Sequence, residues 1–219
     1  MTNDSLIEIF NRLADHFGPL HWWPAETPFE VAVGAILTQN TNWRNVEMAV
    51  AALKKAGILS VAGLLEVERQ RLEELIRSAG FFRQKAERLQ LFAAYLQRNY
   101  GGDLTALLEG PLAEVRRELL TLKGVGPETA DSILLYAGER PSFVVDAYTR
   151  RLFNRLGLLT GEEKYEDIRA LFMDCLPHSC ELFNEFHALI VEECKNYCRV
   201  QPICAACPLQ SICEYDSKL

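Results

Sequence analysis

One aspartate stands directly after a short apolar run, at a place where a carboxylate could do chemistry. Asp146 follows Phe143, Val144 and Val145 and precedes a predicted helix that begins at Ala147. A carboxylate there can cap the helix by accepting backbone N–H bonds. It can also stabilise positive charge on a sugar and orient or deprotonate an attacking water. The two roles are compatible, so Asp146 is the candidate catalytic residue.

A glycine-rich turn precedes this aspartate. Residues 113–137 read as two helices joined by the turn Lys-Gly-Val-Gly at 123–126, with Pro127 at the first position of the second helix. Proline suits that position because its missing N–H needs no partner there. The glycines leave backbone amides uncovered, and the positive end of the helix dipole adds to a phosphate site. The motif is a helix-hairpin-helix, which binds DNA backbone without reading sequence; a plain turn between helices is the alternative.

Four cysteines near the end of the sequence could hold a metal. They are separated by five, two and five residues, at Cys198, Cys204, Cys207 and Cys213. In a reducing compartment such a group indicates a metal site rather than disulfides. The spacing alone leaves zinc and an iron–sulfur cluster both open.

Helices must position these residues. Apolar side chains recur with helical period in 45–59 and 84–97, and strand-like alternation is almost absent. Glycine, proline and asparagine separate segments of about 10 to 15 residues, which predicts an all-α fold of roughly ten helices. The turn at 138–141 is the best candidate for a passage between two helical subdomains.

The composition narrows the class of protein. The net charge is -7 and 49% of residues are hydrophobic. No apolar stretch approaches the roughly 18 residues of a membrane span, and no export pattern is present, so we expect a cytoplasmic protein without a membrane partner. Basic residues gather in three clusters that favour a polyanionic partner: Arg83, Lys85 and Arg88; Arg116, Arg117 and Lys123; and Arg150, Arg151 and Arg155.

The pattern L-x-G-V-G-x-x-T-A, followed by V-V-D-A-Y-T-R-R, resembles the DNA glycosylase superfamily typified by endonuclease III. The resemblance implies two helical subdomains with DNA in the cleft between them: 25–137, with six helices and the hairpin at about 113–137, and 1–24 with 138–219. It makes Asp146 the catalytic carboxylate. It also implies that the hairpin binds DNA, through Lys123, Gly124, Val125, Gly126 and Thr129.

The same resemblance favours a [4Fe-4S] cluster held by the four cysteines of 198–213. The gaps of two and five residues fit the family, whereas the first gap is five residues where the usual pattern has six. Cys194 lies one helical turn earlier and is the alternative first ligand, although Cys198 lies nearest the expected gap. We expect the cluster to have a structural role.

Members that also cut the strand carry a lysine two residues after the second hairpin glycine. Glu128 occupies that position here, and a carboxylate cannot form a Schiff base. The sequence therefore predicts a monofunctional glycosylase whose nucleophile is water. Lys123 remains the candidate for a minor lyase reaction.

The segment 21–47 resembles the 3-methyladenine glycosylases of this superfamily, because it combines a Trp-Trp-Pro run with L-T-Q-N-T and a following aromatic residue. The resemblance implies a pocket for an alkylated, cationic purine, which aromatic rings attract through stacking and cation–π interaction. Gln39 would fill the space that the flipped base leaves. The residues expected to bind substrate are Trp22, Trp23, Pro24, Gln39 and Trp43.

The predicted function is excision of bases such as 3-methyladenine, 7-methylguanine or hypoxanthine from damaged double-stranded DNA, by a monomer in the cytoplasm near the nucleoid. The main alternative is an endonuclease III-like glycosylase and lyase that acts on oxidised pyrimidines or mismatches. A non-catalytic, cluster-bearing DNA-binding module is the other alternative, although phosphate binding alone gives no use for Asp146.

Overall fold

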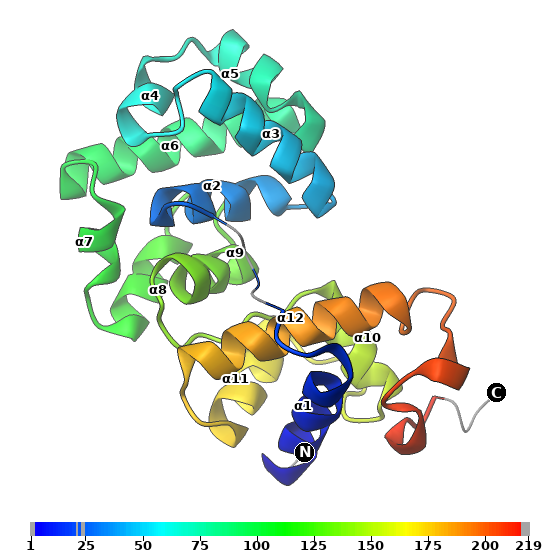
Figure 1. The fold of residues 1–219 in the computed structure, drawn as a ribbon. Coiled ribbons are helices and arrows are strands. Elements are labelled where there is room, and N and C mark those ends of the chain that lie inside the picture. Colours follow the sequence, from blue (N-terminus) through cyan, green and yellow to red (C-terminus); the bar gives the residue numbers. More distant parts are fainter. Residues whose placement is uncertain (1–2, 21, 23–24, 216–219) are drawn as a thin grey trace. The chain divides into compact units, whose positions relative to one another are not determined.

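The computed structural model describes residues 3–20, 22 and 25–215, and all regular structure in these residues is helical (Figure 1). The prediction of an all-α fold is confirmed. Among the described helices, none combines the length and the apolar character that crossing a bilayer requires.

The chain divides into two compact units, residues 25–140 and residues 1–24 with 141–219. The first unit contains eight α-helices rather than the expected six, because several short helices interrupt its connections. They are α2 (Pro28–Thr38), α3 (Trp43–Lys55), α4 (Val61–Glu66), α5 (Arg69–Leu75), α6 (Phe82–Tyr100), α7 (Leu104–Leu108), α8 (Leu112–Leu120) and α9 (Pro127–Ser132), which continues as a π-helical turn over Ile133–Ala137. The second unit contains α1 (Asn3–Phe17), α10 (Ala147–Arg155), α11 (Tyr165–Cys175) and α12 (Cys180–Asn196), followed by short 3-10 turns at Cys204–Ala206 and Gln210–Ile212.

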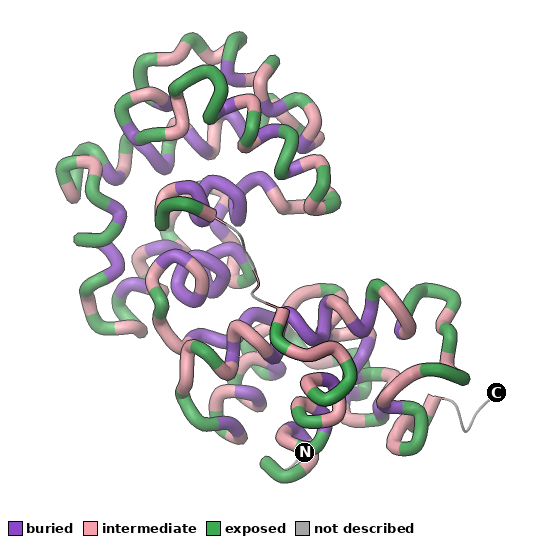
Figure 2. The backbone as a smooth tube through the Cα atoms, in the orientation of Figure 1, coloured by how far each residue is buried: buried purple, intermediate pink, exposed green. Residues whose placement is uncertain are grey.

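Helix α2 forms the centre of the unit 25–140. Thr27 caps its start by accepting a bond from Glu30 N at 3.1 Å, and Pro28 takes the first helical position. Every residue from Glu30 to Leu37 is buried (Figure 2). A helix that is apolar on all sides must be surrounded, and α2 contacts α3, α6, α7 and α9.

The other unit is built on phenylalanine. The Phe143 ring stacks on Phe172 with centroids 3.9 Å apart, and Phe183 and Phe186 meet Phe143 edge-on. Residues 143–145 are 0 to 1% exposed. The apolar run therefore anchors the chain in this core immediately before Asp146.

Candidate functional site

The two glycines of the hairpin turn differ in whether the fold requires a glycine at their position. Gly124 has φ +85°, and a Cβ there would lie 2.3 Å from the Arg88 side chain. Gly126 has φ −90° and ψ 177°, which any residue adopts, and nothing lies within 4 Å of an added Cβ. The fold requires glycine at 124 but not at 126. Gly126 has no side chain, so the first amides of α9 receive no side-chain cap bond from it.

Gln39 braces this turn from the end of α2. Its Nε2 donates to Gly124 O at 2.7 Å and to Thr129 Oγ1 at 2.9 Å. Arg88 Nη1 in turn donates to Gln39 Oε1. Thr129 is only 5% exposed, so its hydroxyl is used inside the unit rather than on the surface. Gln39 was predicted to fill the space that the flipped base leaves, and in this structure its side-chain amide holds the hairpin.

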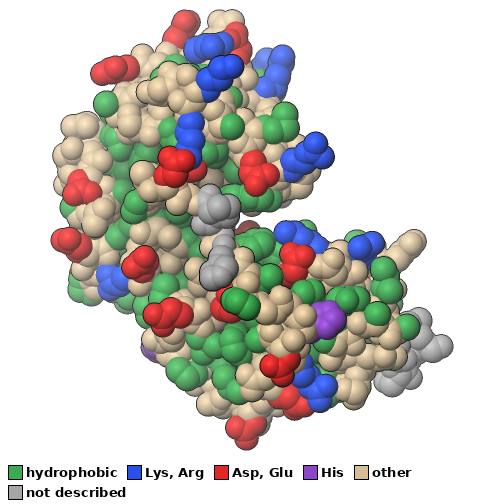
Figure 3. Space-filling model, viewed as in Figure 1, with side chains coloured by type: hydrophobic (Ala, Val, Ile, Leu, Met, Phe, Trp, Pro, Cys, Tyr) green, Lys and Arg blue, Asp and Glu red, His purple; other side chains and the backbone are tan. Residues whose placement is uncertain are grey.

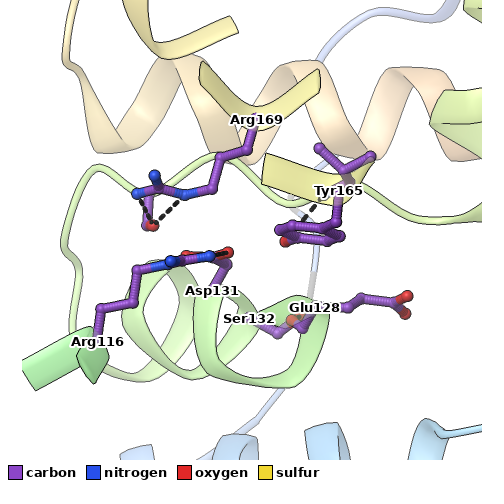
Figure 4. A network of polar contacts seen from close by, with 8 residues as sticks. Arg116, Glu128, Asp131, Ser132, Tyr165 and Arg169 are labelled. Atoms are coloured by element: carbon purple, nitrogen blue, oxygen red, sulfur yellow. Dashed lines mark hydrogen bonds and ion pairs between the residues drawn. The ribbon is translucent and has the colours of Figure 1, made fainter. Parts of the chain in front are cut away.

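A buried ion pair joins the two hairpin helices. Arg116 of α8 donates Nε and Nη2 to the two carboxylate oxygens of Asp131 in α9, at 2.8 and 2.9 Å (Figure 4). Asp131 is completely buried. Arg116 was expected among the DNA-facing basic residues, but its charge is matched within the fold.

At the exposed side of the turn, Lys123 Nζ lies 2.6 Å from Glu87 Oε1. Both side chains are open to solvent, with 66% and 40% exposed. Val125 between the glycines is 7% exposed and anchors the turn in the core. The turn thus presents one exposed lysine over an apolar anchor.

Asp146 lies at the N-terminus of α10 and caps it, as predicted. Its Oδ1 accepts bonds from Thr149 N at 2.8 Å and from Thr149 Oγ1 at 3.0 Å. Its Oδ2 lies 3.5 Å from His187 Nε2, and only 15% of the Asp146 side chain is exposed. Burial alone would raise the pKa of Asp146, but His187 and the bonds from Thr149 outweigh it and hold the pKa below its usual range. The carboxylate is therefore negatively charged at neutral pH.

Sequence reasoning missed His187. It comes from α12, within the apolar stretch Phe186 to Ile190, and its side chain is 7% exposed. A single histidine within an apolar helix was the only sequence feature that could have drawn attention to it. The sequence spacing between His187 and Asp146 does not predict that they are neighbours. Only the packing of α10 against α12 brings the two side chains together.

The tryptophans predicted to bind substrate fall in different units. Trp22 lies under Lys195, whose Nζ is 4.8 Å from the ring centroid, and its buried Nε1 has no hydrogen-bond partner among the described residues. Trp43 begins α3 and donates Nε1 to Glu47 Oε1 at 2.9 Å. The predictions for Trp23 and Pro24 lie outside the described residues.

Exposed Phe81 is a further candidate that sequence reasoning did not single out. It is 62% exposed and adopts φ +44° directly before α6. A non-glycine residue in this conformation is strained, and burial does not explain the aromatic ring. The strained turn holds a large apolar side chain in solvent.

Three of the four predicted cluster cysteines make hydrogen bonds at one end of the unit. Arg155 Nη1 donates to Cys198 Sγ at 3.3 Å, while Cys213 Sγ lies 3.4 Å from Arg155 O. Cys207 Sγ donates to Glu193 Oε1 at 3.1 Å. The described residues contain no set of three or more side chains arranged as metal ligands. The donor chemistry nevertheless fits an iron–sulfur cluster, because one short segment supplies four thiols and Arg155, which donates to Cys198 Sγ, can offset thiolate charge there.

Most basic side chains that were expected to face phosphate are used inside the fold. Lys85 is 1% exposed and donates Nζ to Leu37 O and Ala79 O, and burial lowers its pKa to about 8. Arg151 donates to Cys198 O at 2.8 Å, and Arg150 to Glu163 O at 2.8 Å. On the face drawn in Figure 3, acidic and basic side chains are interspersed. Basic residues clustered in sequence therefore do not form a cluster of free cations.

A comparison with known proteins identifies a family of DNA repair proteins. Residues 33–178 match the HhH-GPD superfamily base excision DNA repair proteins. A protein of Methanocaldococcus jannaschii, whose name provisionally assigns it to the DNA repair glycosylases, is 47% identical over 96% of each chain.

Two solved structures are also similar. A non-covalent endonuclease III–DNA complex superimposes with a TM-score of 0.86 at 25% identity, over 100% of this chain and 98% of that one. The H. pylori 3-methyladenine DNA glycosylase bound to 1,N6-ethenoadenine superimposes with a TM-score of 0.75 at 27% identity, over 89% and 98%.

Proposed function

Since the chain belongs to the HhH-GPD superfamily of base excision DNA repair proteins, we propose that this DNA N-glycosylase removes alkylated purines such as 3-methyladenine. Asp146 is its catalytic residue, water is the nucleophile, and the strand is left uncut. We further propose that it acts as a monomer on double-stranded DNA in the cytoplasm, near the nucleoid.

The main support for this proposal is that Asp146 is ionised and held in place by Thr149. Breaking an N-glycosidic bond passes through a transition state with positive charge on the sugar. A carboxylate that is already ionised and held in place stabilises that charge without reorganising. Thr149 fixes Oδ1 of Asp146 with two bonds, and His187 lies beside Oδ2. The helix cap is thus also what orients the catalytic charge.

The identity of residue 128 supports a monofunctional reaction. Glu128 stands where strand-cutting relatives carry their Schiff-base lysine, and it cannot form that adduct. Lys123, the nearest alternative amine in the hairpin, is engaged with Glu87 at 2.6 Å. The chain is therefore suited to attack by water.

The hairpin and Phe81 would hold the duplex while the base is outside it. The start of α9 carries no side-chain cap at Gly126 and would suit a phosphate. Exposed apolar side chains can enter between base steps and support a distorted duplex, which gives the strained Phe81 a use. Trp22, Trp23, Pro24, Gln39 and Trp43 are the proposed substrate-binding residues, as the likeness to a 3-methyladenine glycosylase suggests.

We also propose that Cys198, Cys204, Cys207 and Cys213 hold a [4Fe-4S] cluster. It would tie the segment 198–213 to the end of α12 and so have a structural role. Anaerobically purified protein should be brown and contain about four irons per chain. Stoichiometric zinc in a colourless, folded preparation would contradict the cluster.

The structural similarity to endonuclease III supports one alternative function, that of a glycosylase and lyase acting on oxidised pyrimidines. Excision on duplexes carrying 7-methylguanine, hypoxanthine, thymine glycol or a mismatch, with and without alkali, separates the two. We expect release of alkylated purine, strand breaks only after alkali, and no adduct trapped by borohydride. Release of oxidised pyrimidine with efficient trapping would establish the rival.

A further inference from the structure

One carboxyl group of α12 is completely enclosed. Glu193 is 0% exposed and follows the buried apolar run from Ala188 to Val191 on the same helix. Its Oε1 accepts a hydrogen bond from Cys207 Sγ at 3.1 Å. Its Oε2 is buried too, and has no hydrogen-bond partner among the residues that the structure describes. A buried polar atom without a partner costs free energy, so packing alone gives no reason for a glutamate here.

The same residue contacts two of the four cysteines that we propose as cluster ligands. The backbone O of Glu193 accepts from Cys198 N at 3.0 Å, just beyond the end of α12. Its carboxyl group bonds to Cys207. One residue therefore joins the first and the third cysteine of the segment 198–213. Because both oxygens belong to one carboxyl group, the unpartnered Oε2 also lies beside these cysteines.

We propose that Glu193 is a positioning residue of the cluster site, an inference that rests on the proposed cluster and not on which base is excised. Its carboxyl group holds the Cys207 sulfur by a hydrogen bond, and the bound cluster gives the buried carboxyl group its missing partner. Hydrogen bonds to ligand sulfurs help to set the reduction potential of an iron–sulfur cluster and support its ligands. Glu193 thus controls the potential and the lifetime of the cluster, and takes no part in breaking the N-glycosidic bond.

Two substitutions of Glu193 separate hydrogen bonding from the filling of space. Glu193→Gln keeps a donor and an acceptor, so the protein purified anaerobically should keep the iron content and the reduction potential of the wild type. Glu193→Leu fills similar space without a polar atom. Its reduction potential should fall, and the half-life of its visible cluster absorbance in air should shorten about tenfold. Glu192→Gln, on the same helix with its side chain bonded to Asn196, is the matched control and should behave as wild type.

Urea denaturation of the full chain, freed of iron by a chelator, separates this role from a merely structural one. Glu193→Leu removes a buried polar group that lacks a full set of partners, so the unfolding midpoint should stay the same or rise. A midpoint that falls together with the iron content would make Glu193 a structural residue. If the wild type holds iron but Glu193→Leu keeps its potential and half-life, the inference is wrong and the proposed cluster stands. A wild-type protein without iron would overturn the proposed cluster, and this inference with it.

Discussion

The hairpin and the aspartate site differ in where their parts come from. The hairpin can be recognised from neighbouring residues, namely Gly124 for its φ, Val125 as apolar anchor and Pro127 at the start of the helix, although Gln39 also holds it from α2. The aspartate site depends on His187, which α12 brings to Asp146 from far along the chain. A binding motif can therefore be recognised from consecutive residues, whereas the electrostatics of a catalytic group require the packed fold.

The two regions also treat polar groups in opposite ways. The hairpin has no side-chain cap at Gly126, where an added Cβ would meet nothing. The aspartate site encloses a charge. Only 15% of the Asp146 side chain is exposed, and Thr149 and His187 lie beside its carboxylate. The first arrangement suits reversible contact with a backbone, and the second suits stabilisation of developing charge.

The largest effect should come from breaking the buried pair behind the hairpin. Arg116→Met leaves the carboxylate of Asp131 buried without its bidentate partner, so the free energy of unfolding should fall by about 3 to 5 kcal/mol. Urea denaturation measures the loss. The double variant Arg116→Met with Asp131→Leu should recover most of it. A loss below about 1 kcal/mol would mean that the turn sequence alone determines the hairpin.

Asp146→Asn should act on chemistry and not on binding. The amide oxygen can still accept from Thr149, but the negative charge is gone, so single-turnover excision should slow by about 10² or more. Fluorescence anisotropy should give unchanged or improved affinity for the same lesion duplex. Excision at the normal rate by this variant would show that Asp146 acts only as a helix cap.

Gly126→Val should show the opposite pattern. Its φ and ψ suit a β-branched residue and the added side chain meets no atom of the chain, so the melting temperature should stay within about 3 °C. Affinity for damaged and undamaged duplexes should fall about tenfold as the amides are covered. Gly124→Val offers the contrast, since it should destabilise the fold through φ +85° and the clash with Arg88. Wild-type affinity in Gly126→Val would remove the hairpin amides from the interface.

His187→Leu tests whether the distant partner sets the charge of Asp146. His187 helps to hold the Asp146 pKa down, so its removal should raise that pKa and move the acidic limb of the excision profile to higher pH. In the wild type that limb should lie below the usual carboxyl range. Excision at neutral pH should fall several-fold, and His187→Gln, which keeps a donor, should recover part of it. An unmoved acidic limb would assign the low pKa to Thr149 alone.

The smallest effect should come from the exposed lysine of the hairpin. Lys123→Gln removes a solvent-open pair with Glu87, so stability should change by less than about 1 kcal/mol. Duplex affinity should fall a few-fold, and the salt dependence of binding should lose about one phosphate contact. If instead strand cleavage disappears from a measurable background, Lys123 is the source of a lyase reaction.

The sequence was sufficient for the helical class, the start of α9 at Pro127 and the cap at Asp146, because turn residues and periodicity act locally. It was misleading for the basic clusters. Lys85, Arg116 and Arg151 look alike in sequence to free surface cations, yet each satisfies buried carbonyls or a buried carboxylate. Their partners come from other elements of the fold, and so do the partners of Gln39 and the His187 neighbour of Asp146.

The central claim is that hairpin and aspartate divide binding from chemistry, and a double-variant cycle tests it most directly. Excision kcat/KM on one 7-methylguanine duplex is measured for wild type, Asp146→Asn, Gly126→Val and the double variant. Independent functions predict that the two losses add as free energies, within about 0.5 kcal/mol. A coupling well above that value, with Asp146→Asn also weakening duplex affinity, would contradict the division and make the two regions parts of one binding site.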